Sequence, residues 1–536
     1  MTSSCTHQHD NQSLYKAIER LKAYLQSSQF KTILLSTVVF WLAANVFFAT
    51  NTMFSHDALT IYIDETKTSY FIARGRFSEP LYWWLRGSLN VPWLCGILSL
   101  LWITLSNCLV QSFLELRSRT SIILLCGILT VNVSTTLLNA TYLAWSDVYS
   151  FAWLTALISL WLCKRFGWVG IVPGAILLCF SLGLYQAYLS CVLALIVLLC
   201  IKWVFDKVPF KEIAKRFSKM FLCVVSGLIL YKIVSDICMV ICGVDAYSGY
   251  NGIASVGDYS GISIPQLLAQ TWIYPFTILV KPAGTSYPKL VAFANVALVS
   301  ISLFMLFWIA YKQKLGRASV VLLIIVIALS PFAMNAIYFI SKGMIHELMI
   351  QGIQFFFVFA IYMWDLWCAK SSRSTKNGAI IIKAMPLVLL GAIIFNNVVF
   401  ANQVYLKKAL EYDATASLVT RVVDRIEQTD GYVPGETAVA FVGRFDSSPL
   451  LKSRDGFENL TGVGLWSNSA ITYADGSADG GTVYYYFKSI LGYPINLLSQ
   501  KDTIALAATK EVKDMPAFPQ SDSIKMVGNI LVVKIA

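Results

Sequence analysis

Charged residues are scarce in this 536-residue chain. Asp, Glu, Lys and Arg together make up only 13% of it, and the mean hydropathy is +0.64. A soluble globular protein carries roughly 25% charged residues, so the composition excludes that class. Apolar runs of about 20 residues, the length that crosses ~30 Å of hydrocarbon, recur between residues 30 and 400 and then stop. The sequence therefore predicts a polytopic α-helical membrane part followed by a tail that folds in water.

Disulfide frameworks and metal-binding cysteine pairs are also missing. The 12 cysteines lie mostly inside apolar runs, and neither residues 51–92 nor the chain after residue 402 contains one. We interpret them as small apolar residues. There is no CxxC spacing, so we expect no metal site and no other cofactor. The net charge of +12 comes mainly from basic residues at the ends of apolar runs, which argues against nucleic acid as a partner.

No cleavable signal peptide is evident, so we expect the first apolar run to be an uncleaved anchor behind a cytoplasmic segment, 1–30. About eleven spans are predicted, at 31–50, 93–113, 121–138, 147–163, 168–183, 186–202, 220–241, 290–310, 320–340, 345–368 and 379–400. With the N-terminus inside, every cytoplasmic connection is basic, as the positive-inside rule requires. The transmembrane domain is then 31–400, and its loops 51–92 and 242–289 share the outer side with a domain at 401–536.

The first outer loop breaks the charge trend of the other outer connections. Arg74, Arg76 and Arg86 lie in it, which indicates an anionic ligand held by paired hydrogen bonds. Residues 82–84, Tyr-Trp-Trp, are typical of an aromatic belt at the membrane surface. The alternative is a solvated amphipathic loop whose arginines reach lipid headgroups.

The same loop holds the candidate catalytic carboxylates. Asp57 is suited to take a proton from an attacking sugar hydroxyl, provided that desolvation brings its pKa toward working pH. Residues 58–73 fit the period of an interfacial helix imperfectly, with Asp64 and Glu65 off its apolar face.

Two further outer positions are candidates for contact with a phosphate. Tyr185 and Gln186 lie between the fifth and sixth spans and offer a hydroxyl and an amide, although an ordinary interfacial turn explains them equally well. Lys281 follows the apolar run 273–280, where a lysine reaching toward lipid headgroups is the alternative.

The tail has the pattern of a small α/β domain. A helical period extends over 406–426, residues 437–442 and 530–535 are rich in β-formers, and 483–491 fits either strand or helix. Trp466 and Tyr485 belong to an aromatic cluster suited to stacking on sugar rings, with core packing as the alternative use.

Three short motifs occur in a characteristic order. They are Asp57 followed by RGRF at 74–77 and EPL at 79–81, then SLGLYQA at 181–187, then YYY at 484–486 followed by GYP at 492–494. This layout resembles the Gtr family of serotype-converting glucosyltransferases, which enteric bacteria and their bacteriophages carry. His56 stands beside Asp57 where that family has a second acidic residue, so the choice among Asp57, Asp64 and Glu65 stays open.

The resemblance implies a GT-C-like fold and an inverting hexosyltransferase of the bacterial inner membrane. Its donor would be glucose on a polyprenyl (undecaprenyl) phosphate, and its acceptor the O-antigen of lipopolysaccharide on the periplasmic face. Such a reaction needs one general base and support for the departing phosphate. We assign the donor phosphate to Arg74, Arg76, Lys281, Tyr185 and Gln186, and the acceptor to Glu79, Trp466 and Tyr485.

Two other functions fit the same layout. A transporter or flippase of lipid-linked sugars would share the spans, but such proteins usually show paired repeats, and none is found here. Another O-antigen enzyme, such as a polymerase, would share both the spans and the outer loops.

Overall fold

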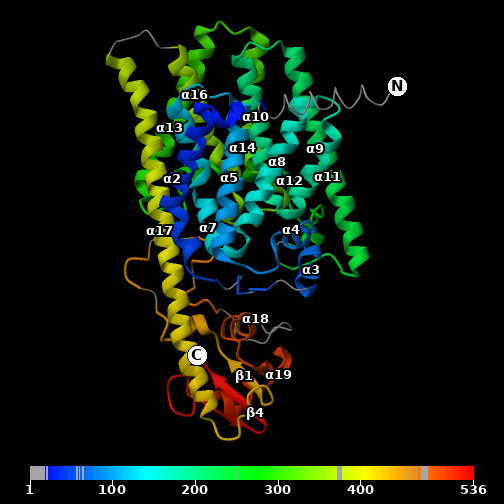
Figure 1. Cartoon of the computed structure of the whole chain (residues 1–536), viewed down its shortest axis with the longest axis vertical. Helices are drawn as coiled ribbons and strands as arrows, with labels where there is room; N and C mark the ends of the chain where they lie inside the picture. The colour runs from blue at the N-terminus through cyan, green and yellow to red at the C-terminus, as the bar shows by residue number, and fades with distance from the viewer. Residues whose placement is uncertain are drawn as a thin grey trace.

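The computed structural model describes residues 19, 22–55, 58–59, 61–62, 65–249, 252–370, 377–452, 454–458, 460, 462–465, 467–471 and 481–536. Within these residues ten helices are long and apolar enough to cross a membrane, and one more apolar helix, Ile171–Leu184, is shorter. They form a bundle from which a smaller domain extends at one end (Figure 1). The chain is a multi-pass membrane protein with a helical fold, as its composition predicts.

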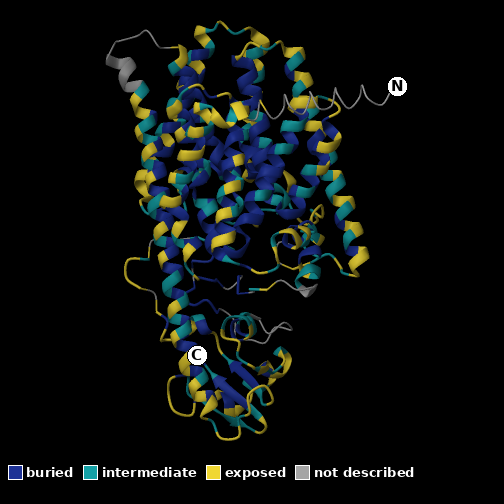
Figure 2. Cartoon of the chain, in the orientation of Figure 1, coloured by how far each residue is buried: buried dark blue, intermediate teal, exposed yellow. Residues whose placement is uncertain are grey.

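The bundle contains α2 (Ser28–Thr50), α5 (Pro92–Leu114), α6 (Arg119–Thr130), α7 (Val133–Thr141), η1 (Leu143–Trp145), α8 (Ser146–Phe166), α9 (Ile171–Leu184), η2 (Gln186–Tyr188), α10 (Leu189–Phe205), α11 (Phe210–Cys242), α13 (Pro288–Lys312), α14 (Arg317–Met334), α15 (Ala336–Ile340), η5 (Gln351–Gln354), α16 (Phe355–Lys370) and α17 (Asn377–Glu427). In the span that contains α10, 89% of the residues of the apolar stretch are buried inside the protein, whereas only 22% are buried in α11 and in α14. Helix α10 is therefore central, whereas α11 and α14 are peripheral (Figure 2).

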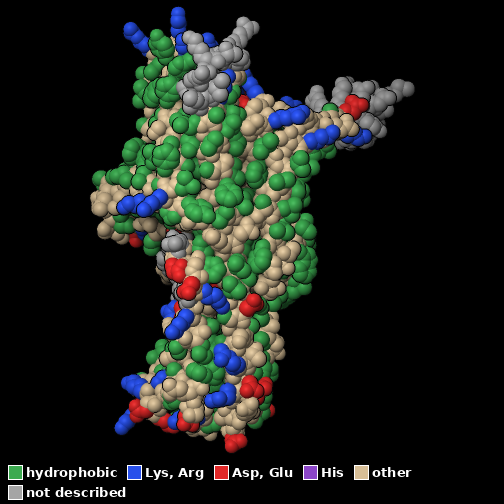
Figure 3. All heavy atoms as spheres, turned by 90° about the vertical axis from the view of Figure 1, so that its left-hand side faces the viewer, with side chains coloured by type: hydrophobic (Ala, Val, Ile, Leu, Met, Phe, Trp, Pro, Cys, Tyr) green, Lys and Arg blue, Asp and Glu red, His purple; other side chains and the backbone are tan. Residues whose placement is uncertain are grey.

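Ion pairs join charged residues of neighbouring helix ends and connections at one end of the bundle. Lys202 Nζ lies 3.0 Å from Glu115 Oε2 and 2.5 Å from Asp206 Oδ2, and Lys164 Nζ lies 3.7 Å from Glu115 Oε1. We call this end the basic face. The described residues of the segment 51–92 lie at the opposite end, called the loop face below (Figure 1). Between the basic face and the charged tail, the surface is mostly apolar with few charges (Figure 3).

The second long connection, predicted as an outer loop over 242–289, contains two helices. After η3 (Ile253–Ser255), the apolar α12 (Ile264–Val280) packs against α13 and α14. The expectation of a loop is wrong for α12, because its apolar residues form a helix, one side of which, with Leu267 and Leu279, is buried. The predicted break at 184–186 is present, since Tyr185 is extended between α9 and η2.

Helix α17 continues from the bundle into the tail without a break. It is 51 residues long, so the domain boundary placed at 400 falls inside it, and the helical period seen over 406–426 is its second half. The span predicted at 345–368 becomes an α-helix only at Phe355, the first residue of α16. Its first residues form η4 (Glu347–Met349) and η5 before α16.

The tail domain is built on a four-stranded sheet of order β2-β1-β4-β3. Its elements are β1 (Ala438–Val442), η6 (Phe445–Ser447), α18 (Gly481–Tyr485), η7 (Tyr486–Leu491), β2 (Asn496–Leu497), α19 (Gln500–Ala507), α20 (Lys510–Lys513), β3 (Ile524–Val527) and β4 (Ile530–Lys534). β1 is parallel to β2 and β4, with Val439 opposite Leu531, and β3 pairs with β4 antiparallel across a turn at Gly528. The two β-rich segments were predicted from the sequence, and the ambiguous stretch 483–491 is helical.

The tail also folds back onto the loop face of the bundle. Val463 N donates a hydrogen bond to Glu347 Oε2 (3.3 Å), and a Cβ atom at Gly462 would lie 2.9 Å from Leu137 of α7. Lys67, in the first loop, lies 4.2 Å from the ring centre of Tyr485. The tail, the first loop and the bundle therefore share one contact region.

Candidate active site

Gly75 determines the turn between α3 (Glu65–Ile72) and α4 (Glu79–Arg86). It has φ +71°, and a Cβ atom there would lie 2.4 Å from both Ile253 Cδ1 and Tyr231 Oη. Glycine adopts positive φ at little cost, and a larger residue there would have to displace the side-chain ends of Ile253 and Tyr231. The turn is thereby pressed against α11, and the arginines on either side of it enter different surroundings.

Arg76 reaches the loop-face ends of α8 and α9. Its Nη1 donates to Tyr149 Oη (3.2 Å), and its guanidinium carbon lies 5.7 Å from the ring centre of Tyr185. Within the described part of the chain, this five-donor group makes this bond and a 3.6 Å approach to Glu79, both through Nη1. The side chain is 21% exposed. Arg76 thus presents several N–H groups to a partly open site.

Glu79 lies one helical turn from Arg76 and is fully buried. Its Oε1 is 3.6 Å from Arg76 Nη1, and its Oε2 accepts a hydrogen bond from Trp145 Nε1 (3.1 Å). Burial raises the pKa of Glu79 from 4.5 to about 8, against the opposing effect of Arg76 and the hydrogen bond from Trp145. The carboxyl group is therefore mostly protonated at neutral pH, and it neutralises little of the arginine's charge.

A close backbone contact connects this loop to the SLGLYQA segment. Ser78 N donates to Gly183 O (3.0 Å), and a Cβ atom at Gly183 would lie 2.4 Å from Ser78 Oγ. Gly183, within this segment, leaves the room for this approach. The contact fixes Tyr185 beside Arg76, and the Tyr185 hydroxyl is buried without a hydrogen-bond partner in the described residues.

Arg86 and Asp147 anchor α4 to α8 through a buried ion pair. Arg86 Nη1 lies 3.1 Å from Asp147 Oδ1, with the side chains 2% and 0% exposed. The Tyr82 hydroxyl donates to Asp147 Oδ2 (3.0 Å), and Arg86 Nη2 donates to Asn90 Oδ1 (2.8 Å). The third arginine of the loop is therefore occupied in positioning and offers no anion site.

Two sequence expectations for this loop are wrong. Tyr82 and Trp83 are 5% and 2% exposed and do not form a surface belt, because α4 packs them onto the bundle, and only Trp84, at 76%, faces outward. Of the described residues in 58–73, where an interfacial helix was expected, only those of α3 are α-helical. Before it, Tyr62 forms an isolated β-bridge with Leu89.

Arg74 has a different environment from Arg76. Its guanidinium carbon lies 3.5 Å from the ring centre of Tyr70 and 3.7 Å from that of Tyr247, as cation–π contacts require. Gln186 Nε2 donates to the backbone oxygen of Arg74 (3.2 Å) and to Tyr231 Oη (3.0 Å). Gln186 therefore fixes the turn through hydrogen bonds to its backbone and to α11, whereas the Arg74 side chain is stacked between two aromatic rings.

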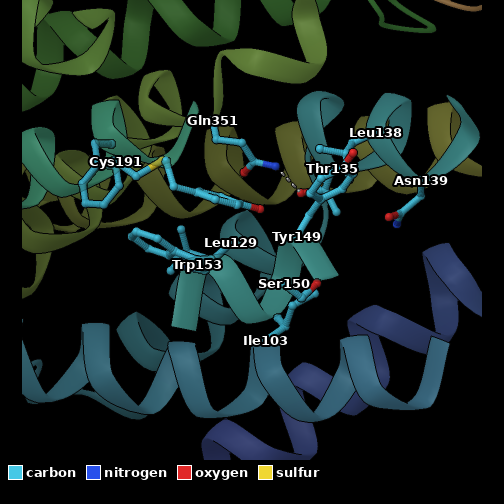
Figure 4. A pocket seen from close by; sticks show the side chains of 12 residues that line it. Ile103, Leu129, Thr135, Leu138, Asn139, Tyr149, Ser150, Trp153, Cys191 and Gln351 are labelled. Atoms are coloured by element: carbon cyan, nitrogen blue, oxygen red, sulfur yellow. Dashed lines mark hydrogen bonds between the residues drawn. The ribbon is translucent and has the colours of Figure 1, made fainter. Parts of the chain in front are cut away.

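A small cavity adjoins Arg76 on the inner side of Tyr149. Tyr149, Trp153, Tyr188 and the hydrogen-bonded pair Gln351 and Thr135 (3.1 Å) line it, together with apolar residues (Figure 4). It leaves about 30 Å³ for the centres of water-sized atoms, enough for about two waters. A sugar does not fit into it in this conformation.

The model of the GtrII glucosyl transferase family matches residues 46–364, more than half of the chain. The chain belongs to this family. The match includes α3, α4 and every Arg76 contact described above, while the tail domain lies outside it. No curated protein matches the chain.

As a GtrII family member the chain is a glucosyltransferase, and several predicted site residues can be located. Arg76, Glu79, Tyr185 and Gln186 come together at the loop-face ends of α8 and α9. Lys281 instead lies exposed at the C-terminal end of α12.

Other predicted residues fall in parts that the structure leaves undescribed or shows differently. Asp57, Asp64 and Trp466 lie outside the described residues, and of Glu65 only the backbone, at the start of α3, is described. Tyr485 is half-buried in the tail and faces Lys67 of the first loop.

Sequence reasoning missed three contributors to this GtrII site, Tyr149, Trp145 and Asp147. All lie within an apolar span or at its edge, where aromatic residues are ordinary. Asp147 was the one available signal, since an ionisable residue at the end of a span needs a partner.

Proposed function

We propose that this GtrII family member transfers glucose from a polyprenyl (undecaprenyl) phosphate to lipid-linked or lipopolysaccharide O-antigen. In this proposal the N-terminus and the basic face are cytoplasmic, and the loop face and tail domain are periplasmic. The protein then resides in the bacterial inner membrane, and the reaction inverts the anomeric carbon in one displacement. Serotype conversion of the host cell is the biological outcome.

Arg76 is the single observation that carries the proposal. It lies at the end of apolar helices, where a lipid-borne phosphate would arrive, and it keeps most of its N–H groups unused in the described structure. Guanidinium binds phosphate through paired, charge-assisted hydrogen bonds. The unpartnered hydroxyl of Tyr185, beside it, is a further donor to the same group.

The chemistry requires one base and one leaving-group site. An acceptor hydroxyl loses its proton to a carboxylate of the first loop, Asp57 in our assignment, and its oxygen attacks C1 of glucose. The C1–O bond to phosphate breaks, and its electron pair leaves with the lipid phosphate. Arg76 stabilises that phosphate, because its charge is fixed in place before the reaction.

The test uses cells that supply the carrier-linked donor. Asp57→Asn is expected to leave the protein intact in the membrane but to abolish added glucose, measured by mass and linkage analysis of the lipopolysaccharide. Arg76→Ala should reduce it strongly, whereas the matched control Arg165→Gln, on an exposed position of the basic face, should not. Unchanged glucosylation in Asp57→Asn would remove Asp57 from the base role, and unchanged glucosylation in Arg76→Ala would refute the phosphate site.

A further inference from the structure

The tail domain touches the first loop through a lysine that lies over a tyrosine ring. Lys67, in the first turn of α3, places its Nζ 4.2 Å from the ring centre of Tyr485, the last residue of α18. Figure 1 shows α3 on the side of the bundle that faces the tail, and α18 on the side of the tail that faces the bundle. The family match ends at residue 364, so Lys67 belongs to the matched part of the chain and Tyr485 does not.

This contact continues along α3 as an alternation of cations and aromatic rings. Lys67 Nζ also lies 5.2 Å from the ring centre of Tyr70, and the guanidinium carbon of Arg74 lies 3.5 Å from the same ring centre. Arg74 in turn lies 3.7 Å from the ring centre of Tyr247, in the second long connection. All these distances are within the ~6 Å range of a cation–π contact. We call the five side chains Tyr485, Lys67, Tyr70, Arg74 and Tyr247 the cation–aromatic row.

Helix α3 is therefore held at both ends by parts of the chain that are distant in sequence. At its C-terminal end, Tyr247 N donates a hydrogen bond to Ala73 O (2.8 Å). At its N-terminal end, Lys67 meets Tyr485 of the tail. The helix has 8 residues, so it spans only about 12 Å, and so short a hydrogen-bonded helix moves as one piece. A shift at Lys67 is thus passed to the turn that carries Arg76.

The position of Tyr485 changes the use expected for it from the sequence. A sugar ring stacks on the face of an aromatic ring, and in Tyr485 the Lys67 ammonium lies over that ring. The edge of the ring system is also engaged, because Tyr484 and Tyr485 have ring centres 5.6 Å apart in an edge contact. This geometry suits a residue that holds the first loop better than a platform for the acceptor.

We propose that the tail domain is a positioning element of the donor site. Tyr485 holds α3 through Lys67, and α3 holds the turn that presents Arg76 to the donor phosphate. Lys67 and Tyr485 are positioning residues, and neither touches the substrate. The proposal rests on the proposed function, in which Arg76 binds the phosphate of the donor. It gives the tail, which lies outside the family match, a part in the transfer reaction.

The expected effect is small, because the tail can bias the turn by no more than the strength of its contact. One exposed cation–π contact corresponds to roughly two- to five-fold in an equilibrium constant. Donor binding selects the turn in its competent position, so loss of the contact raises the donor KM by about that factor. The turnover number and the acceptor KM should not change.

The kinetic test uses the full-length protein in proteoliposomes, with polyprenyl phosphate glucose as donor and lipopolysaccharide from cells that lack this protein as acceptor. Tyr485→Ala and Lys67→Met should each raise the donor KM by that factor. Tyr485→Phe and Lys67→Arg keep the ring and the charge, so they should restore the parent value. The double variant should be no worse than either single variant, because both act through one contact.

The matched control is Lys488→Met. Lys488 forms the same kind of contact with Tyr484, 5.2 Å from its ring centre, but both residues belong to the tail. Its donor KM should equal that of the parent. Lys67→Met changes the first loop alone, so it decides the question even where Tyr485→Ala disturbs the folding of the tail.

Hydrogen exchange of the backbone amides, measured by mass spectrometry without substrate, tests the mechanical step by itself. Residues 66–79 should exchange faster in Tyr485→Ala and Lys67→Met than in the parent, and at the parent rate in Lys488→Met. Unchanged exchange in both test variants would mean that the tail does not hold α3, and it would overturn the proposal.

The kinetic outcomes separate the alternatives. A raised acceptor KM with an unchanged donor KM would make Tyr485 an acceptor contact and overturn the positioning role. Faster exchange with an unchanged donor KM would overturn it as well, because α3 would then be held without consequence for the donor. Parent-like glucosylation in Arg76→Ala would instead refute the phosphate site of the proposed function, and the positioning role would fall with it.

Discussion

The carboxyl group of Glu79 should make donor binding depend on pH. Burial raises its pKa to about 8, and its Oε1 lies 3.6 Å from Arg76 Nη1. Below that pH the group is neutral, and the charge of Arg76 is available to a phosphate. Above it, the ionised carboxylate competes with the phosphate for the same guanidinium.

The size of the effect follows from that pKa. If only the protonated form binds donor, the apparent donor KM scales with 1 + 10^(pH − pKa), which is roughly 1.1-fold at pH 7 and roughly 11-fold at pH 9 for a pKa near 8. The same titration also lowers the stability of the fold as pH rises. The folded pKa lies above the ordinary value of 4.5, so stability is lost as pH rises from 4.5 to about 8, by at most ~1.4 kcal/mol per unit.

The assay is transfer of labelled glucose from polyprenyl phosphate glucose by the purified protein in proteoliposomes between pH 6 and 9. The parent should show the rise in donor KM, and Glu79→Gln, which cannot ionise, should show a flat donor KM. A general base that titrates elsewhere changes kcat and leaves this difference intact. An equal donor KM at both pH extremes in the parent, or the same rise in Glu79→Gln, would refute the reasoning.

Three further predictions address the loop. Arg86→Met should destabilise the protein by about 3–5 kcal/mol because it leaves Asp147 buried and unpaired, and adding Asp147→Leu should restore most of it. Thermal unfolding in detergent measures both, and no recovery in the double variant would contradict the ion-pair account. Gly75→Ala should reduce transfer, whereas Gly243→Ala, at a similar positive φ of +63° but with nothing within 4 Å of its Cβ position, should retain it. Equal losses would mean that backbone strain, and not the clash, matters. Arg76→Lys should lower kcat/KM for the donor at least about ten-fold, since an ammonium cannot form the paired hydrogen bonds, and parent-like kinetics would exclude a paired contact.

The sequence predicted the elements whose signal is local. Apolar length gave the spans, and β-branched runs gave the segments that became β1 and β4. The continuity of α17 was missed, because composition changes from apolar to polar near residue 400 while the helix does not end there. Helix α12 was missed because it lies within a stretch that otherwise has the glycine and polar content of a loop.

The site was harder to predict than the fold because its contacts are long-range. Arg76, Tyr185 and Gln186 were proposed as one group, and they do meet although about 110 residues separate them. Glu79 was assigned to an acceptor, yet its surroundings are Arg76 and Trp145, which no sequence spacing reveals.

Helix α17 has a mechanical consequence. At 51 residues it is roughly 75 Å long, and only about 30 Å of that is needed to cross hydrocarbon. The remainder is a stiff helix that connects the bundle to the sheet, and a stiff helix transmits torque along its axis. Any rotation about the helix axis of the part beyond Pro386, where the backbone ladder lacks one hydrogen bond, therefore turns the sheet through the same angle unless that ladder breaks.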